Sequence, residues 1–312
     1  MTAPLFADAP RTGRVLFRVD AGRLPGLSFG HLERCHVLAE QLRAEHGSDI
    51  ALLMRPLADG LARARALGER VALPEEWPAL LAAADILVMD LPYDPEPEIL
   101  DAARRAGAFL ALLDDTGRDL FPCDAVLNSS LLANPAMYPR ARHTLLGPEH
   151  FILGPGFAGL RHRGSGDGGP ALVLFSFGGS DPAGLTLRTL HALDGLAPFP
   201  ACRLQVVLGP GFGPTDEVEA ALAALPAPGE ILRAPRDVAP LFAGCDLAVC
   251  AGGRTLYELH ALGTPTLALA SAPHEEQQVE AFAQRGLIAG GLTCWNDKTF
   301  AALFSAQFGR PS

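Results

Sequence analysis

Short runs of apolar residues recur along the first half of the chain, at residues 15–17, 50–54, 86–89, 109–113 and 125–127. The apolar residues within each run are consecutive rather than alternating. This pattern is typical of strands that are buried on both faces of a parallel sheet. We therefore predict a series of buried parallel strands in this half.

The segment between the first two runs has the periodicity of a helix. Leu32, Cys35, Leu38, Ala39 and Leu42 recur at intervals of three and four residues, and charged residues occupy the other side. This spacing predicts one amphipathic helix over residues 31–44. A strand, a helix and a second strand in this order favour right-handed βαβ crossovers, and hence an α/β fold.

A second series of apolar runs follows at residues 171–175, 204–208, 231–232, 247–249 and 266–269. The stretch before it is rich in glycine, which is typical of a linker. We expect an amino-terminal α/β domain over residues 1–155, a linker over 156–170 and a carboxyl-terminal α/β domain over 171–312. Two doubly wound, Rossmann-like parallel-sheet domains would face a cleft lined by the carboxyl ends of their strands, where such sheets bind ligands.

Composition excludes several classes of protein. The chain has 25 Lys and Arg against 35 Asp and Glu, a net charge of −10, so we expect no nucleic acid as a partner. No apolar run approaches the length of a membrane-spanning helix, and the first residues do not resemble a secretory signal. The six cysteines lack metal-binding spacing. We expect a cytoplasmic protein with reduced cysteines and no membrane insertion, and take a monomer as the working state.

The first candidate site is Gly30-His31, with Arg34 one helical turn later. Glycine permits close approach of a ligand, and the start of a helix offers N–H groups to an anion. Because the positive end of a helix disfavours an imidazolium, His31 could act as a neutral general base. The alternative is a histidine that caps or packs against the turn.

The second candidate is Gly178-Gly179-Ser180, which follows the first strand of the second half. Such a turn can surround a diphosphate with main-chain N–H groups. The alternative is an ordinary strand-to-helix turn capped by Ser180 or Asp181.

The third candidate is Gly252-Gly253-x-Thr255-x-x-Glu258, after the apolar run at 247–249. The glycines open a helix toward an anion, and Glu258 is placed to accept hydrogen bonds from both hydroxyls of a ribose. Together these features predict a nucleotide site. A helix start with a solvent-facing glutamate is the alternative.

Two further strand ends carry polar residues. Asp114-Asp115 could bind a metal or share a proton, although such a pair more often caps a turn. Tyr93 follows Asp90 at another strand end, where it could contact a sugar or lie at the rim of the site.

Taken in order, these segments resemble a known family. Residues 17–21 (Phe-Arg-Val-Asp-Ala), Gly30-His31-x-x-Arg34-Cys35, and residues 145–149, 175–181 and 252–258 are similar to the UDP-sugar hydrolases of pseudaminic acid biosynthesis, which include spore-coat polysaccharide relatives. The resemblance implies a GT-B fold and metal-independent, inverting hydrolysis of a UDP-linked diacetamido sugar. It places the catalytic base on His31, and it implies no cofactor.

The resemblance also suggests roles for other residues. Asp20 would orient His31 or bind a sugar substituent, and Arg34 would hold the first helix or an anion. His274-Glu275 stands where the family has Asn-Gln, so we expect this pair beside the sugar, selecting it. Two alternatives remain: a glycosyltransferase that uses a UDP-sugar donor, and a nucleotide-sugar-binding protein without catalysis.

Overall fold

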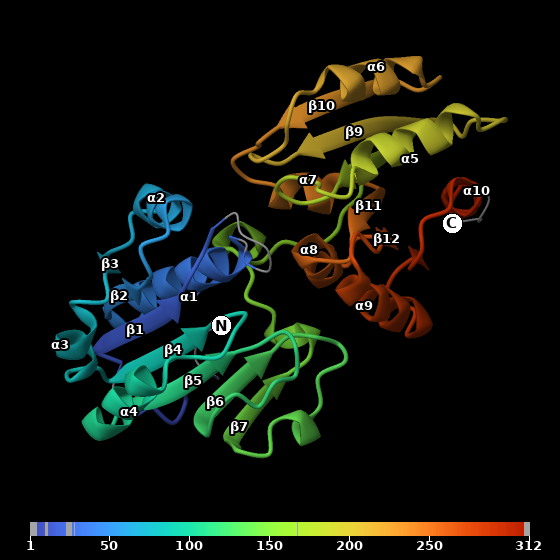
Figure 1. Ribbon diagram of the computed structural model, residues 1–312. Helices are drawn as coiled ribbons and strands as arrows, with labels where there is room; N and C mark the ends of the chain where they lie inside the picture. Colours follow the sequence, from blue (N-terminus) through green and yellow to red (C-terminus); the bar gives the residue numbers. More distant parts are fainter. Residues whose placement is uncertain (1–4, 10–11, 23–26, 28, 167, 309–312) are drawn as a thin grey trace. The chain divides into compact units, whose positions relative to one another are not determined.

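The computed structural model describes residues 5–9, 12–22, 27, 29–166 and 168–308. The chain divides into two compact units, Met1–Gly154 and Pro155–Ser312 (Figure 1). Asp167, in the predicted linker, lies outside the described residues. Each unit is built on its own parallel sheet.

The first unit contains a seven-stranded sheet in the order β3-β2-β1-β4-β5-β6-β7. Its strands are β1 (Arg14–Val19), β2 (Asp49–Leu53), β3 (Val71–Ala72), β4 (Ile86–Asp90), β5 (Phe109–Leu113), β6 (Cys123–Asn128) and β7 (Ala141–Leu146). All the pairings are parallel; Val19 of β1, for example, lies opposite Asp90 of β4. The order of the strands reverses between β1 and β4.

Helices cover both faces of this sheet, as expected for strands that are apolar throughout. They are α1 (Gly30–His46), α2 (Ala58–Ala66), α3 (Trp77–Leu81) and α4 (Pro97–Ala106). Phe17 and Leu52 pack in one core with Leu32 of α1 and Leu61 of α2, whereas Leu16 packs in a second core with residues of α3 and α4. Successive residues of one strand thus belong to opposite cores.

The second unit contains a six-stranded sheet in the order β10-β9-β8-β11-β12-β13. Its strands are β8 (Ala171–Ser176), β9 (Cys202–Leu208), β10 (Gly229–Arg233), β11 (Leu247–Ala251), β12 (Thr266–Leu269) and β13 (Gly290–Leu292), all in parallel pairing. Here the order reverses between β8 and β11.

The helices of the second unit are α5 (Leu185–Asp194), α6 (Asp216–Ala224), α7 (Ala239–Gly244), α8 (Arg254–Leu262), α9 (Pro273–Gln284) and α10 (Asp297–Ser305). One core joins the sheet to α5, α6 and α10 through residues such as Leu190, Val218 and Phe300. Helices α8 and α9 meet where the rings of Tyr257 and Phe282 pack edge to face, with centroids 5.3 Å apart.

The structure confirms the predicted α/β class and its two parallel sheets. Three strands were not expected: β3 and β13, which are very short, and the edge strand β7, whose residues 142–144 are exposed. Part of the predicted linker is bonded to the second unit, since His162 N–H donates to the Leu262 carbonyl (2.8 Å) and Arg163 N–H to that of Ala243 (2.9 Å).

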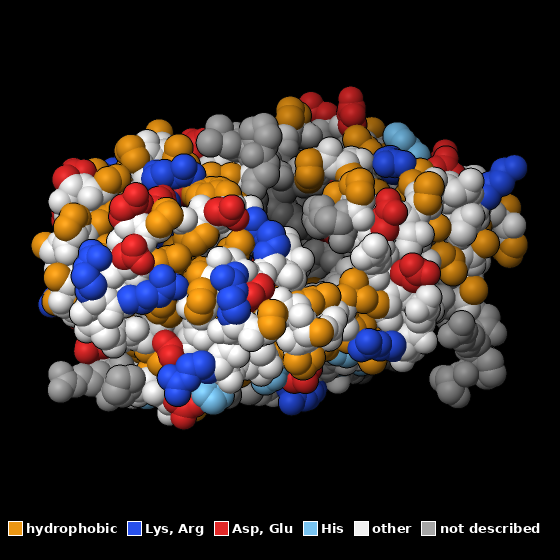
Figure 2. Space-filling view, turned by 60° about the horizontal axis from the view of Figure 1, so that its bottom comes forward, with side chains coloured by type: hydrophobic (Ala, Val, Ile, Leu, Met, Phe, Trp, Pro, Cys, Tyr) orange, Lys and Arg blue, Asp and Glu red, His pale blue; other side chains and the backbone are white. Residues whose placement is uncertain are grey.

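The surface, the helices and the cysteines of the described residues have the following features. On the face shown in Figure 2, basic and acidic side chains are interspersed and form no field of one sign. Within the described ranges, no helix combines the length and the apolar character needed to cross a bilayer. All six cysteines are free thiols, and only Cys294 is exposed.

Candidate functional site

The first group of site residues lies where the strand order of the first sheet reverses. Ligands of open α/β sheets bind at such a switch point, outside the carboxyl ends of the strands. Asp20 directly follows β1, and α1, which carries His31 and Arg34, begins after the same strand. Asp90 ends the neighbouring strand β4. The topology therefore gathers these residues at one edge.

His31 is paired with Asp90. Its Nδ1 atom lies 2.6 Å from Oδ1 of Asp90. Because a carboxylate can only accept a hydrogen bond, Nδ1 is the donor in this contact; Nη2 of Arg34 lies at the longer distance of 3.2 Å from the same nitrogen. The other ring nitrogen, Nε2, is then the basic one. Asp90 is completely buried, whereas His31 keeps 19% of its side chain exposed, so the imidazole is accessible while its partner is fixed.

Arg34 links two acidic residues at this edge. Its guanidinium donates to both oxygens of Asp90, at 2.6 Å each, and to both of Asp115, at 2.6 and 2.8 Å. Burial alone would raise the pKa of Asp90, but the charge and hydrogen bonds of Arg34 and His31 hold it well below the usual aspartate range. Asp90 is therefore an anion under all ordinary conditions, and Arg34 is a structural partner of it.

Asp20 belongs to a different group and does not contact His31. It is completely buried and accepts hydrogen bonds from Arg18 (2.9 Å), from the Nε and main-chain N–H of Arg55 (2.6 and 2.8 Å), and from the hydroxyl of Tyr93. The guanidinium of Arg55 also stacks on the Tyr93 ring, 4.5 Å from its centroid. The carboxylate that contacts His31 is thus Asp90 and not Asp20, because the oxygens of Asp20 are bonded to Arg18, Arg55 and Tyr93.

The acidic pair after β5 divides its roles. Asp114 accepts the main-chain N–H groups of Thr116, Gly117 and Arg118 at 2.7 to 3.1 Å, so it caps the turn. Asp115 is the exposed partner of Arg34. Neither arrangement is that of a shared proton between the two carboxyls.

In the second unit, the turns after β8 and β11 follow the two strands between which the strand order of that sheet reverses. Gly178, Gly179 and Ser180 are exposed, and Gly178 has a φ of +82°, which favours glycine. The alternative cap is also present: Asp181 accepts the N–H groups of Leu185 and Thr186, at 2.9 and 2.7 Å. The start of α5 is thereby satisfied by Asp181, which leaves the exposed turn itself to meet a ligand.

The turn after β11 leads directly into α8. Gly252 N–H is used inside the protein, since it donates to the Leu269 carbonyl (3.0 Å) and to Glu275 (3.2 Å). Donors for an anion must therefore come from the next residues, Gly253 to Thr255, where the first turn of a helix leaves its N–H groups without helical acceptors. Thr255 is buried.

Glu258 lies one turn into α8. Only 14% of its side chain is exposed, and Arg254 holds it loosely, with Nη2 of Arg254 3.5 Å from Oε1. Burial raises the pKa of Glu258 above the ordinary glutamate value, and Arg254 offsets this only in part. A buried carboxylate with such weak local compensation is suited to accept hydrogen bonds from hydroxyl groups of a ligand.

Glu275, which was expected to lie beside the sugar together with His274, is instead bonded to other residues of the protein. It is buried, and its Oε2 accepts the N–H and the hydroxyl of Ser271, both at 2.8 Å, in addition to Gly252 N–H. Its carboxylate thus binds the protein's own turns. His274 lies in the first turn of α9, and its side chain is outside the described part of the structure.

At the carboxyl edge of the first sheet, the roles of two residues were not predicted from the sequence. Asp90 is the partner of His31, and Arg55 is the partner of Asp20 and Tyr93. Both come directly at or after the carboxyl end of a strand adjacent to β1. That position was the available signal, since polar residues at the carboxyl ends of neighbouring parallel strands share one edge of the sheet.

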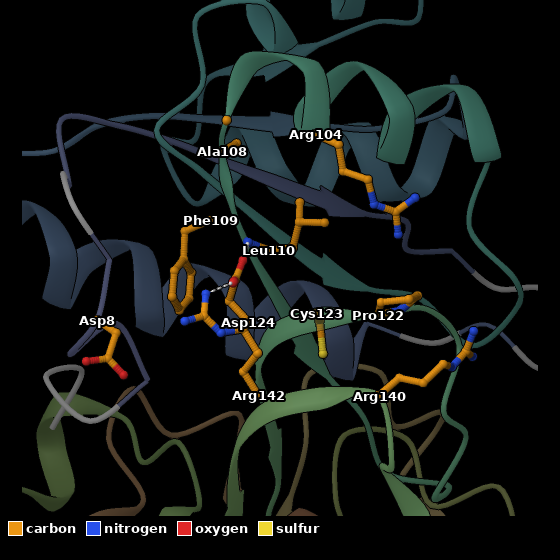
Figure 3. Close-up of a pocket in the computed structure, with 11 residues that line it drawn as sticks. Asp8, Arg104, Ala108, Phe109, Leu110, Pro122, Cys123, Asp124, Arg140 and Arg142 are labelled. Carbon is orange, nitrogen blue, oxygen red and sulfur yellow. Dashed lines mark hydrogen bonds and ion pairs between the residues drawn. The ribbon is translucent and has the colours of Figure 1, made fainter.

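A pocket of about 560 Å³ lies at the opposite, amino edge of the first sheet (Figure 3). It is lined by Asp8, Arg104, Gly107, Ala108, Phe109, Leu110, Pro122, Cys123, Asp124, Arg140 and Arg142. Its three arginines already face carboxylates: Arg142 lies 3.1 Å from Asp124, Arg140 lies 2.6 Å from Asp119, and Arg104 lies 3.5 Å from Asp101. The pocket contains none of the predicted site residues.

Three residues of the first unit, two of them on α1, are of the types that bind metal ions. Ligand atoms of His36, Glu40 and Glu69 all lie within 4.8 Å of one another. However, Arg43 donates to Glu40 at 2.6 Å and to Glu69 at 2.5 Å, and a hydrogen bond with Glu69 raises the pKa of His36. A guanidinium therefore supplies the positive charge here, and we assign this group to ion pairing.

Comparison with known proteins supports the fold and a distant relationship. No protein-family model matches the chain. Over 205 residues it is 25% identical to the spore coat polysaccharide biosynthesis protein SpsG of Bacillus subtilis (strain 168), and the match takes in 65% of this chain. The chain matches only 60% of the length of SpsG.

Several solved structures, a rhamnosyltransferase among them, align with nearly the whole chain. MurG of Acinetobacter baumannii has a TM-score of 0.67 at 15% identity, over 95% of this chain and 90% of that one. The spinosyn rhamnosyltransferase SpnG, complexed with thymidine diphosphate, has a TM-score of 0.57 at 16% identity, over 95% and 92%. UGT89C1 of Arabidopsis thaliana, complexed with UDP-L-rhamnose, has a TM-score of 0.54 at 12% identity, over 96% and 91%. The fold is therefore GT-B, and the chain is a distant relative of SpsG.

Proposed function

We propose that this protein hydrolyses a UDP-linked amino sugar to UDP and the free sugar, with inversion at the anomeric carbon, in the biosynthesis of a surface polysaccharide or nonulosonic acid. The observation that carries the proposal is the His31–Asp90 pair at 2.6 Å, at the switch point of the first sheet. The SpsG relationship and the nucleotide complexes of the similar transferases support the substrate class.

The residues of the first unit supply the base. Asp90 accepts the Nδ1 proton of His31, which fixes the tautomer and leaves Nε2 unprotonated. Nε2 then removes a proton from a water molecule as the water attacks the anomeric carbon on the face opposite to UDP. The developing imidazolium is stabilised by the buried Asp90 carboxylate. One displacement of this kind inverts the anomeric configuration.

The residues of the second unit bind the nucleotide in this proposal. The exposed turn Gly178-Gly179-Ser180 and the first turn of α8 bind the diphosphate through main-chain N–H groups. Glu258 accepts hydrogen bonds from the two ribose hydroxyls. UDP is a good leaving group, so the proposal requires no acidic residue beside it and assigns no step to a metal ion or cofactor.

A glycosyltransferase is the second candidate, because the spinosyn rhamnosyltransferase SpnG shares the fold. In that reaction the same histidine would deprotonate an acceptor hydroxyl instead of water. A protein that only binds nucleotide sugars is the third candidate.

One screen separates the three. The protein is incubated with a panel of UDP-sugars, with and without acceptors, and with EDTA in a parallel series, and UDP and free sugar are measured by mass spectrometry. Hydrolysis predicts both products without an acceptor and unchanged rates in EDTA. UDP release only with an acceptor would indicate a transferase, and no release under any condition would indicate a binding protein.

A further inference from the structure

Glu275 connects two turns that follow neighbouring strands. It lies in the first turn of α9, and only 8% of the residue is exposed. Its Oε2 atom accepts three hydrogen bonds: from Ser271 N–H and Ser271 Oγ after β12, and from Gly252 N–H after β11. A single carboxylate oxygen thus joins the β12–α9 turn to the β11–α8 turn.

The turn at Gly252 also packs tightly against α9. A Cβ atom added to Gly252 would lie 2.9 Å from the Cβ of Glu275 and 2.8 Å from Cγ2 of Val279. A Cβ added to Gly253 would lie 3.1 Å from Oε1 of Glu275. Both glycines are therefore in direct contact with Glu275, and the position of this side chain sets how close the turn comes to α9.

The fixed turn determines where α8 begins. Gly252 is held on one side by the Leu269 carbonyl, at 3.0 Å, and on the other by Glu275. Gly253 is the residue before the first helical residue, Arg254. Any displacement of Gly252 would move the N–H groups that open the helix.

We propose that Glu275 is a positioning residue, which holds the amino end of α8 in the geometry that binds a nucleotide diphosphate. The inference rests on the proposed function, because it concerns the same diphosphate site. Glu275 acts through the main chain of Gly252 and Gly253 and does not touch the ligand.

The role is geometric rather than electrostatic. A carboxylate repels a diphosphate, so direct attraction cannot explain a buried glutamate at this place. What Glu275 supplies is one acceptor oxygen shared by three donors, the N–H and hydroxyl of Ser271 and the N–H of Gly252, which also donates to the Leu269 carbonyl. Glutamine keeps an acceptor oxygen at the same reach, whereas aspartate keeps the charge but is one methylene shorter.

The test compares ligands with and without phosphates. UDP and uridine are titrated by NMR into wild type, Glu275→Ala, Glu275→Asp and Glu275→Gln, and melting temperatures are recorded for each. Glu276→Ala, which changes the exposed neighbour on the same helix, is the matched control. We expect Glu275→Ala and Glu275→Asp to weaken UDP about tenfold or more while uridine changes less than about twofold. Glu275→Gln should bind UDP with an affinity within about threefold of wild type, and Glu276→Ala should change the affinity for neither ligand.

Each result has one meaning. A wild type that binds neither UDP nor UDP-sugars would overturn the proposed function and this inference with it. If the wild type binds UDP but the folded variants lose affinity for UDP and uridine equally, or lose affinity for neither, only the inference about Glu275 is overturned. Glu275→Asp and Glu275→Gln keep the test decisive if Glu275→Ala does not fold.

Discussion

Nδ1 of His31 lies 2.6 Å from Oδ1 of Asp90, although the two residues are 59 positions apart in the chain. The parallel sheet produces this contact, because β1 and β4 are neighbours while β2 and β3 lie on the other side of β1. A histidine at the start of the helix after β1 and an aspartate at the end of β4 therefore meet at one edge. The pairing gives His31 a defined tautomer.

Removal of the Asp90 charge should impair catalysis. Asp90→Asn keeps the shape of the side chain but can place an amide donor against Nδ1, which favours the wrong tautomer. A positioned base contributes about 10²–10⁴-fold to the rate, and loss of the residue that orients it should remove part of this. We therefore expect kcat to fall about tenfold or more. Steady-state kinetics measure the effect, with Asp101→Asn on the exposed side of α4 as the control. An unchanged kcat in a folded Asp90→Asn protein would mean that Asp90 does not orient the base.

The same aspartate should make stability depend on pH in acid. The pKa of Asp90 is lower in the folded state than in the unfolded state. Its contribution to the free energy of unfolding is therefore fully present when the pH is above the unfolded-state pKa. The contribution is lost as the pH falls through the folded-state pKa. The window therefore begins below about pH 4. Urea unfolding from pH 5 to pH 2 should show the difference in unfolding free energy between wild type and Asp90→Asn shrinking over this range. If the difference in unfolding free energy stays constant over this range, Asp90 is not a stabilising buried anion.

Glu258→Ala should weaken UDP by about 1.5–3 kcal/mol, the scale of hydrogen bonds to a charged group. The loss should come from the ribose, so 2′-deoxy-UDP should bind the variant nearly as well as UDP does. Calorimetry with both nucleotides measures this, with Glu280→Ala on α9 as the exposed control. Equal UDP affinity in wild type and Glu258→Ala would place the nucleotide elsewhere.

Gly209→Ala should disturb the turn that we assign to the diphosphate. A Cβ atom at this position would lie 2.5 Å from the Gly178 carbonyl oxygen and 2.5 Å from the Gly179 Cα, both main-chain atoms. We expect UDP affinity to fall about tenfold and the melting temperature to drop by several degrees, on the order of the 1–3 kcal/mol that overpacking costs. Gly213→Ala is the control, because a Cβ there meets no atom within 4 Å. Identical UDP affinity in the two variants would separate this turn from the nucleotide.

The sequence predicts much of this fold because buried parallel strands are apolar without interruption. The run at 109–113 became β5 with the same bounds. The edge strand β7 escaped prediction, since Arg142, His143 and Thr144 are exposed and resemble a loop in composition.

The sequence predicts where the turns of the candidate site lie in the fold. Glycines after apolar runs mark the carboxyl edges of the sheets, and the three predicted turns lie there. What the sequence could not reveal is which acidic residue reaches which partner. Asp20 is nearer to His31 in the chain than Asp90 is, yet it bonds Arg18, Arg55 and Tyr93. Glu275 similarly reaches Gly252, 23 positions earlier, through the pairing of β11 with β12.

The most direct test of the central claim is to follow the reaction of a UDP-sugar by proton NMR, without acceptor, and to compare wild type with His31→Ala. The account predicts that the first free sugar to appear has the anomeric configuration opposite to that of the substrate. It also predicts that His31→Ala lowers kcat by about 10²–10⁴-fold while binding UDP as tightly as wild type, with His46→Ala at the far end of α1 unaffected. A first product with retained configuration, or near wild-type turnover by His31→Ala, would contradict the account.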